Sequence, residues 1–229
     1  MVVADATLRL SQYVESAAKW LAMADREGFR VMVVENSGFD LRSLKMAMPS
    51  EARARLVVVG LDAPPSCASR RGKGASESLM IDQAIRAIDA EPTEWIAKST
   101  GRLFVRNMPR ALPLRDENLS LVMRGTLGGG YVDSRLLIAR GETWATDLKD
   151  MTHEVDEQEG VFLEHVIARR VIEGERSRAL IVGRFRRAPQ FVGVSGTTGQ
   201  RYDGATTLRR LLVSPLEHSL RLIPRNKQF

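Results

Sequence analysis

The chain has 229 residues, of which 44% are apolar, so it is long and apolar enough for one large domain with a buried core. Its only cysteine, Cys67, excludes an intrachain disulfide, and the three histidines show no metal-ligand spacing. The net charge of +6 suits an anionic partner, and equally an ordinary cytosolic protein. Because no apolar run approaches the roughly 20 residues of a membrane span and the start does not resemble a signal peptide, we expect a soluble, cytoplasmic protein.

The first half of the chain alternates helical and strand patterns. In order, we expect a helix at 10–24 that ends at Gly28, a buried strand at 30–35, a helical piece near 41–54, a buried strand at 56–59, a polar loop at 63–75, a helix around 81–88 and a strand, a turn and a second strand at 95–107. This order predicts an α/β sheet that is largely parallel. Ligands in such sheets collect at the carboxyl ends of the strands.

The second half is more mixed. We expect strands at 119–123, 136–139, 179–183 and 191–194, a helix at 162–171, and a leucine- and arginine-rich segment at 208–225. That last segment suits either an amphipathic surface on an anionic membrane or core leucines with solvated arginines. Nucleic-acid binding by the arginines is disfavoured, because aromatic residues make up only 6% and no stacking pattern is present.

Several polar residues follow the predicted strands of the first half. Glu35-Asn36-Ser37 can hydrogen-bond a base or ribose, or it can close the strand as an Asx turn. Lys98 and Arg102 lie in a later turn that also follows a strand, at 98–102. The turns at 36–38, 60–74 and 98–102 could therefore face one crevice.

Gly72-Lys73-Gly74 suggests a phosphate-binding loop but does not match the P-loop motif. Cys67 occupies the position of the first glycine, and Gly74 occupies that of the Ser or Thr. What remains is either a backbone that an anion can approach closely or a solvated loop. Glu77 is expected in the first turn of the following helix, where it favours the helix dipole or touches a ligand hydroxyl.

Two pairs in the second half carry ionisable side chains. Glu164 and His165 are the best carboxylate and imidazole for proton transfer, although adjacent helical residues point in different directions and a surface pair is the plainer reading. Asp133 and Arg135 flank the start of a strand and could pair with each other.

The motifs in order resemble a group of bacterial GT-A-like glycosyltransferases found with capsule and lipopolysaccharide genes. The similarity covers roughly residues 8–204 and rests on six segments: ENSG at 35–38, GKGASE at 72–77, AKSTGRLF at 97–104, YVDSR at 131–135, VFLEH at 161–165 and GVSGTTG at 193–199. The chain departs from the group in Ser76 and Leu103. Only Met1-Val2-Val3 precedes the first helix, so the first strand of the fold is expected to be truncated or to start upstream.

The resemblance implies a single GT-A-like domain over 1–229, with a mixed, mainly parallel sheet flanked by helices. Its nucleotide-binding half is about 1–110 and its acceptor-side half about 111–229. Glu164 is implied as the catalytic base, with His165 second and Asp133 third. The implied substrate-binding residues are Glu35, Asn36, Ser37, Gly72, Lys73, Gly74, Glu77, Lys98, Thr100, Gly101, Arg102 and Arg135.

The function that the resemblance implies is transfer of a sugar from a nucleotide-sugar donor to a surface polysaccharide or lipopolysaccharide precursor. Many GT-A enzymes hold a divalent metal on an Asp-x-Asp motif, but this chain has Lys98 and Arg102 at the comparable strand end. Because two cations can neutralise a leaving diphosphate, we expect transfer without a cofactor, with a divalent metal as the alternative. The basic carboxyl-terminal segment is expected to contact the inner face of the membrane. A non-catalytic nucleotide- or glycan-binding protein of the same fold is the second hypothesis, and a nucleic-acid-binding module is the third.

Overall fold

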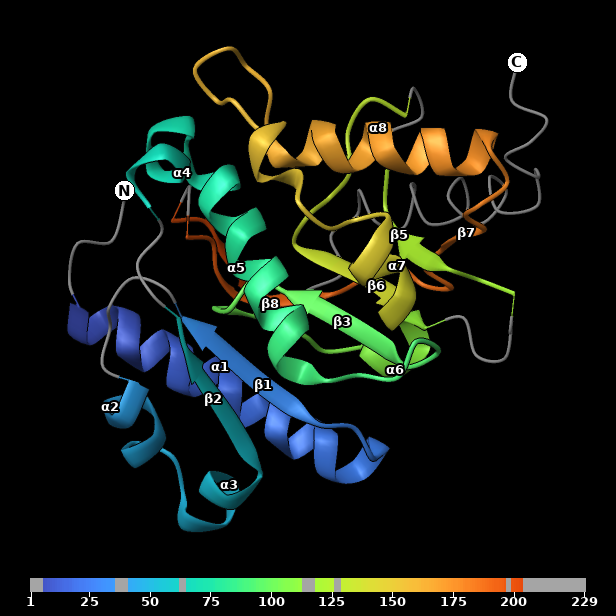
Figure 1. Ribbon diagram of the computed structural model, residues 1–229. Helices are drawn as coiled ribbons and strands as arrows, with labels where there is room; N and C mark the ends of the chain where they lie inside the picture. Colours follow the sequence, from blue (N-terminus) through green and yellow to red (C-terminus); the bar gives the residue numbers. More distant parts are fainter. Residues whose placement is uncertain are drawn as a thin grey trace.

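The computed structural model describes residues 6–35, 41–61, 65–112, 118–125, 129–196 and 199–203. Over these ranges the protein is a mixed α/β structure (Figure 1). Its elements are, in chain order, α1 (Ala6–Glu27), β1 (Val31–Glu35), α2 (Leu41–Met46), α3 (Ser50–Arg55), β2 (Leu56–Gly60), α4 (Ser66–Arg71), α5 (Lys73–Ile88), β3 (Trp95–Ser99), β4 (Leu103–Val105), α6 (Met108–Ala111), β5 (Leu121–Met123), β6 (Leu136–Arg140), α7 (Gly141–Thr146), the 3-10 helix η1 (Met151–His153), α8 (Leu163–Arg176), β7 (Val182–Arg184), β8 (Phe191–Val194) and β9 (Arg201–Asp203).

The strands of the described residues form a parallel pair, β1 and β2, a four-stranded sheet in the order β3-β6-β5-β7, and a three-stranded sheet in the order β4-β8-β9. Of the six strand pairings, only β1 with β2 and β5 with β7 are parallel. The expectation of a mainly parallel sheet is therefore wrong. A parallel neighbour needs a crossover connection, usually a helix, whereas no helix of the described residues lies between β5 and β6.

The four-stranded sheet is buried on both faces. Along β6, Leu137 and Ala139 pack on the side of α5, α7 and α8, whereas Leu136 and Ile138 pack on the side of β4 and β8. Successive side chains of a strand point to opposite faces, and here each face meets a separate apolar cluster. This double burial explains why the segment is an uninterrupted apolar run.

The first helix packs against both the β1–β2 pair and β4. Ala17 and Leu21 of α1 pack against Leu56 at the start of β2, and Trp20 Nε1 donates a hydrogen bond to the carbonyl of Leu103 in β4 at 2.9 Å. Gly28 ends α1, as expected, with a φ of +74° that a glycine adopts readily. This helix therefore connects the parallel pair to the rest of the fold.

The segment at 63–75 is not the loop that its glycines and prolines predict. Within its described part it contains α4 and the start of α5. Pro65 lies immediately before α4, and Gly72 separates the two helices with a φ of +112°. Proline and glycine are breakers inside a helix but are common at helix boundaries, which is where this chain has them.

The two expectations about the membrane have different outcomes. None of the helices within the described ranges has both the length and the apolar character that a membrane span requires. The basic segment at 208–225 lies outside the described residues.

Asp82 of α5 is a buried carboxylate that fastens this helix to the turn before η1. Its two oxygens accept the backbone N–H of Asp150 at 3.2 and 3.1 Å. Burial raises the pKa of Asp82; the hydrogen bond from Asp150 opposes the increase, the Asp150 carboxylate adds to it, and Arg86 and Arg170 oppose it. The net shift is upward, so the folded state disfavours the charged form.

We expect this carboxylate to make the stability depend on pH. Because the folded-state pKa of Asp82 lies above the unfolded value of about 3.9, the folded state binds the proton first as the pH falls. The free energy of unfolding should therefore rise as the pH falls through the folded-state pKa, and fall again as the pH rises through it. The free energy of unfolding is measured by denaturant unfolding at several pH values. In Asp82→Asn, which keeps an acceptor oxygen, it should lose this part of its dependence on pH. The control Asp89→Asn, at an exposed residue, should keep it. An unchanged slope in Asp82→Asn would contradict the assignment.

Candidate functional site

The ends of β1 and β3 lie near one another although the two strands are not paired. At their starts, Arg30 forms an ion pair with Glu94 at 2.8 Å. At their carboxyl ends, Tyr13 of α1 lies against Gly101, where a Cβ atom would come within 2.7 Å of the ring. Burial raises the pKa of Tyr13, and the nearby Glu35 carboxylate raises it further against the effect of Arg102 and Arg9. Tyr13 therefore stands between the two strand ends.

A row of hydrogen bonds joins four segments on the α5 side of the four-stranded sheet. Lys98 of β3 forms an ion pair with Glu77 of α5 and donates to the carbonyl of Ser134 at 2.7 Å. The hydroxyl of Ser134 donates to Glu164 Oε1 at 2.6 Å. We call these residues, Glu77, Lys98, Ser134 and Glu164, the polar row. The four residues come from four different segments of the predicted site, and all of them except Ser134 were predicted site residues, so the structure brings these segments together.

The strand register explains why Lys98 faces this row. In the antiparallel pairing of β3 with β6, Lys98 lies opposite Leu137 and Ile96 lies opposite Ala139. Opposed residues project from the same face of a sheet, and this face packs on α5 and α8. The lysine side chain is only 13% exposed, so Glu77 provides a buried cation with its counter-ion.

Arg102 extends to the other side of the β3–β4 turn. Its guanidinium donates a hydrogen bond to Gln12 of α1 at 3.2 Å, and a Cβ atom at Gly196 would overlap with it. None of the described carboxylates forms an ion pair with Arg102. Lys98 and Arg102 thus have different surroundings, one near α5 and one near α1.

The turn between these cations is shaped by Thr100 and Gly101. The backbone N–H of Thr100 donates to the carbonyl of Arg135 at 3.2 Å, and the carbonyl of Thr100 accepts from Leu103 at 2.8 Å. Gly101 has no side chain, which allows the ring of Tyr13 to lie close to the turn. Asn36 and Ser37, which were expected in the same site, lie outside the described residues.

Asp133 and Arg135 pair with each other, as one interpretation of the sequence predicted. Arg135 Nε donates to Asp133 Oδ1 at 2.7 Å, and a second nitrogen contacts the other oxygen. The guanidinium carbon of Arg135 lies 4.5 Å from the ring centroid of Phe191 and 5.4 Å from that of Tyr202. The hydrogen bond with Asp133 raises the pKa of Arg135 despite its burial. Because both oxygens of Asp133 are engaged, this residue is better suited to positioning Arg135 than to accepting a substrate proton.

His165 is engaged at the start of α8. Its Nδ1 accepts the backbone N–H of Phe162 at 3.3 Å, and its ring meets those of Tyr131 and Phe162 edge to face, with centroids 5.7 and 5.6 Å apart. Burial raises the pKa of Tyr131, and the carboxylates of Glu164 and Asp133 raise it further against the effect of Arg135. The phenol therefore remains an O–H donor beside Glu164.

The glycines at 72–74 meet a carboxylate of the chain itself. The backbone N–H of Gly74 donates to Glu157 Oε1 at 2.6 Å, and a Cβ atom at Gly72 would overlap with the same side chain. Lys73 is the first residue of α5 and is exposed. Glu77 is not in the first turn of α5, as was expected, but in the second, where it contacts Lys98. A carboxylate at a helix N-terminus is favourable, so Glu157 occupies the place that the sequence suggested for an external anion.

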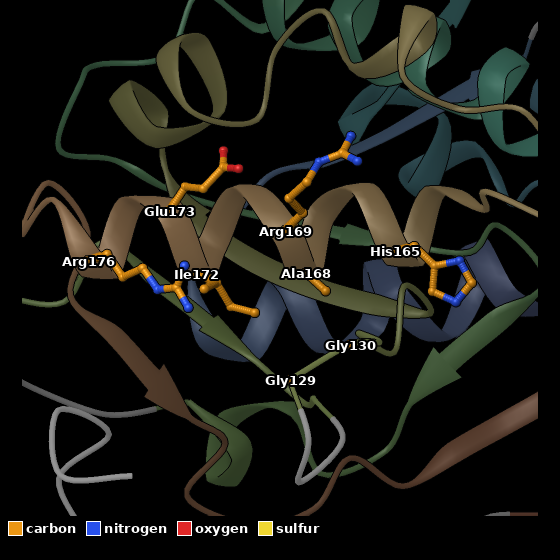
Figure 2. Close-up of a pocket in the computed structure, with 8 residues that line it drawn as sticks. All are labelled: Gly129, Gly130, His165, Ala168, Arg169, Ile172, Glu173 and Arg176. Carbon is orange, nitrogen blue, oxygen red and sulfur yellow. The ribbon is translucent and has the colours of Figure 1, made fainter. Parts of the chain in front are cut away.

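An open groove runs beside α8 (Figure 2). Its volume is about 330 Å³. It is lined by Gly129 and Gly130 of the preceding loop and by His165, Ala168, Arg169, Ile172, Glu173 and Arg176 of α8. We call this the α8 groove.

Three residues of this region gave no individual signal in the sequence. Ser134 lies between two charged residues that drew attention instead, Tyr13 is on a helix distant in sequence, and Glu157 is one of several acidic residues in a polar loop. Among the described residues, no three side chains of His, Cys, Asp or Glu come together as a metal-binding group. The chain matches no protein-family model, no curated protein and no solved structure.

Proposed function

We propose that the protein is a glycosyltransferase with a GT-A-like fold, which moves a sugar from a nucleotide-sugar donor to a surface polysaccharide or lipopolysaccharide precursor. The observation that carries the proposal is the polar row, because it connects the Glu164 carboxylate through Ser134 to Lys98 and Glu77. Tyr131 lies near that carboxylate and contacts His165, which lines the α8 groove. The fold and the substrate class rest on the resemblance of the ordered motifs. The mixed α/β architecture is compatible with them.

In the proposed reaction, Glu164 is the general base. The acceptor hydroxyl attacks the anomeric carbon of the donor sugar, the bond from that carbon to the diphosphate oxygen breaks, and the hydroxyl proton passes to the Glu164 carboxylate. The nucleoside diphosphate leaves with the bonding electrons. Such a displacement inverts the configuration at the anomeric carbon. The hydroxyl of Ser134 orients the carboxylate by its hydrogen bond of 2.6 Å.

The donor is assigned to the carboxyl ends of β1 and β3. In this proposal Glu35 binds the nucleoside, with Tyr13 beside it. Arg102, whose guanidinium is partly buried, binds two phosphate oxygens. The strand end at 98–102 offers two cations and no carboxylate, so its residues do not suit a divalent metal. The charge of the leaving diphosphate is therefore neutralised by arginine in this proposal.

A panel of nucleoside diphosphates in a thermal-shift assay tests the donor site. We expect one or a few of them to raise the melting temperature selectively, since a ligand that binds only the folded state stabilises it. We also expect donor turnover to persist in excess chelator. Complete loss that manganese or magnesium restores would contradict metal-independent transfer, and selective binding without donor hydrolysis or transfer would favour a non-catalytic binding protein.

A further inference from the structure

The α8 groove begins at His165, the residue after the proposed base, and follows α8 to Arg176. His165, Ala168, Ile172 and Arg176 are three or four residues apart and so form one stripe of the helix. From His165 to Arg176 the helix rises about 16 Å, at about 1.5 Å per residue. The ring of Tyr131 contacts that of His165 and lies near the Glu164 carboxylate, so one end of the stripe lies near the polar row.

The middle of the groove is lined by apolar side chains on one side and by glycines on the other. Ala168 and Ile172 lie between the two polar ends of the stripe, and in Figure 2 they face the loop with Gly129 and Gly130. At Gly129 a Cβ atom would be 3.2 Å from Ile172, and Gly129 has a φ of +70°. Nothing lies within 4 Å of a Cβ atom at Gly130. Ala168 is buried, so Ile172 supplies the accessible apolar surface of the groove beside the exposed backbone of Gly130, which suits the C–H face and the hydroxyls of a sugar.

The arginines of α8 differ in whether a carboxylate of the protein pairs with them. Arg169 and Arg170 share one carboxylate, that of Glu154. In Figure 2 the side chains of Arg169 and Glu173 rise from the side of α8 away from the two glycines, whereas Arg176 lies on the side toward them. Arg176 is exposed and forms no ion pair with any described residue. The far end of the groove therefore presents an available guanidinium.

We propose that the α8 groove binds the acceptor and that the acceptor is an anionic oligosaccharide, whose phosphate or carboxylate pairs with Arg176. This inference rests on the proposed function, because it takes Glu164 as the base. A guanidinium matches both anions with two parallel hydrogen bonds. Since about 16 Å of helix separates the two ends of the groove, the anionic group lies on a different part of the acceptor from the sugar whose hydroxyl reacts.

Isothermal titration calorimetry of the full chain with three trisaccharides tests the inference. The probes are maltotriose, maltotriose 1-phosphate and trigalacturonic acid, which are neutral, phosphorylated and carboxylated. We expect at least one charged probe to bind about tenfold or more tightly than maltotriose, as one charge-assisted hydrogen bond predicts. The better of the two identifies the anion as phosphate or carboxylate.

Variants locate the interaction. Arg176→Gln should remove the preference for the charged probe, Arg176→Lys should keep part of it, and Arg187→Gln, which changes an exposed arginine outside the groove, should leave it intact. Binding should be unaffected by a saturating nucleoside diphosphate.

Equal binding of charged and neutral probes, no binding of any probe, or an unchanged preference in Arg176→Gln would overturn the inference. Competition with the nucleoside diphosphate would also overturn it, because the groove would then belong to the donor. By contrast, a chain that binds charged trisaccharides but no nucleoside diphosphate would refute the proposed function alone.

Discussion

Replacing Glu164 by glutamine is expected to lower sugar transfer by about 10²–10⁴-fold, the usual contribution of a general base. Glutamine has nearly the shape of glutamate and can still accept the hydrogen bond from Ser134, so the fold should be preserved. It cannot take the proton of the acceptor hydroxyl. Turnover should therefore collapse while nucleoside diphosphate affinity and melting temperature stay near those of the parent protein.

Two further variants serve as comparisons for this measurement. Glu159→Gln changes an exposed carboxylate in the loop before α8 and should retain full turnover. Ser134→Ala removes only the group that orients Glu164 and should have a smaller effect on turnover than Glu164→Gln. Near-normal turnover in a folded Glu164→Gln variant would refute the assignment of the base, and His165 would be the next candidate.

The second large effect is expected at Arg102. Its replacement by alanine should weaken nucleoside diphosphate binding by about 10- to 100-fold, since hydrogen bonds to charged groups contribute about 1.5–3 kcal/mol and about 1.4 kcal/mol corresponds to tenfold. Arg102 has no carboxylate partner among the described residues and donates only to the neutral Gln12. Its guanidinium is therefore available for a phosphate. Titration with the nucleoside diphosphate selected in the thermal-shift panel measures the change.

The role of Lys98 has to be tested with a different set of variants, because its side chain is nearly buried against Glu77. Lys98→Ala alone leaves the Glu77 carboxylate without its counter-ion and is expected to destabilise the fold. The double variant Lys98→Met with Glu77→Gln removes both charges and should stay folded. We expect it to bind the nucleoside diphosphate almost as well as the parent but to lose turnover, since the polar row loses its cation.

Combining Arg102→Ala with that double variant should give the affinity of Arg102→Ala alone, because Lys98 acts through the polar row. Complete loss of donor binding in the combined variant would instead mean that both cations act on the diphosphate. Arg110→Ala, at an exposed arginine of α6, is the matched control. Unchanged affinity in Arg102→Ala would remove the diphosphate contact from the proposal.

The elements with strong periodicity were predictable from the sequence. The stripe of apolar residues at 162–171 became α8, and the predicted strands at 30–35, 56–59 and 136–139 became β1, β2 and β6. The direction of strand pairing was not predictable, because an apolar run buried on both faces reads alike in parallel and antiparallel sheets. The interpretation of 63–75 as a loop was wrong for a similar reason, since composition does not distinguish a breaker inside a helix from one at its boundary.

Some contacts of the candidate site could also be predicted from the sequence, and others could not. Asp133 with Arg135 was predictable because the residues are neighbours in sequence. The pairing of Lys98 with Glu77 and the hydrogen bond from Ser134 to Glu164 depend on the packing of α5, β3 and α8. Local sequence patterns do not predict how such elements pack against one another. Glu157 illustrates the limit most clearly, because a carboxylate far along the chain occupies the glycine-flanked helix start that resembled an anion site.

The register of β3 against β6 restricts how this region can evolve. Lys98 opposes Leu137 and projects toward α5, and a shift of one residue would turn every side chain of β3 to the opposite face. Such a shift would move a lysine into the apolar cluster around Ile138 and turn Trp95 out of it. Insertions and deletions within either strand are therefore incompatible with both the core and the polar row. Changes of length are tolerable only in the connections, so specificity can diverge in the loops while the strands change by substitution alone.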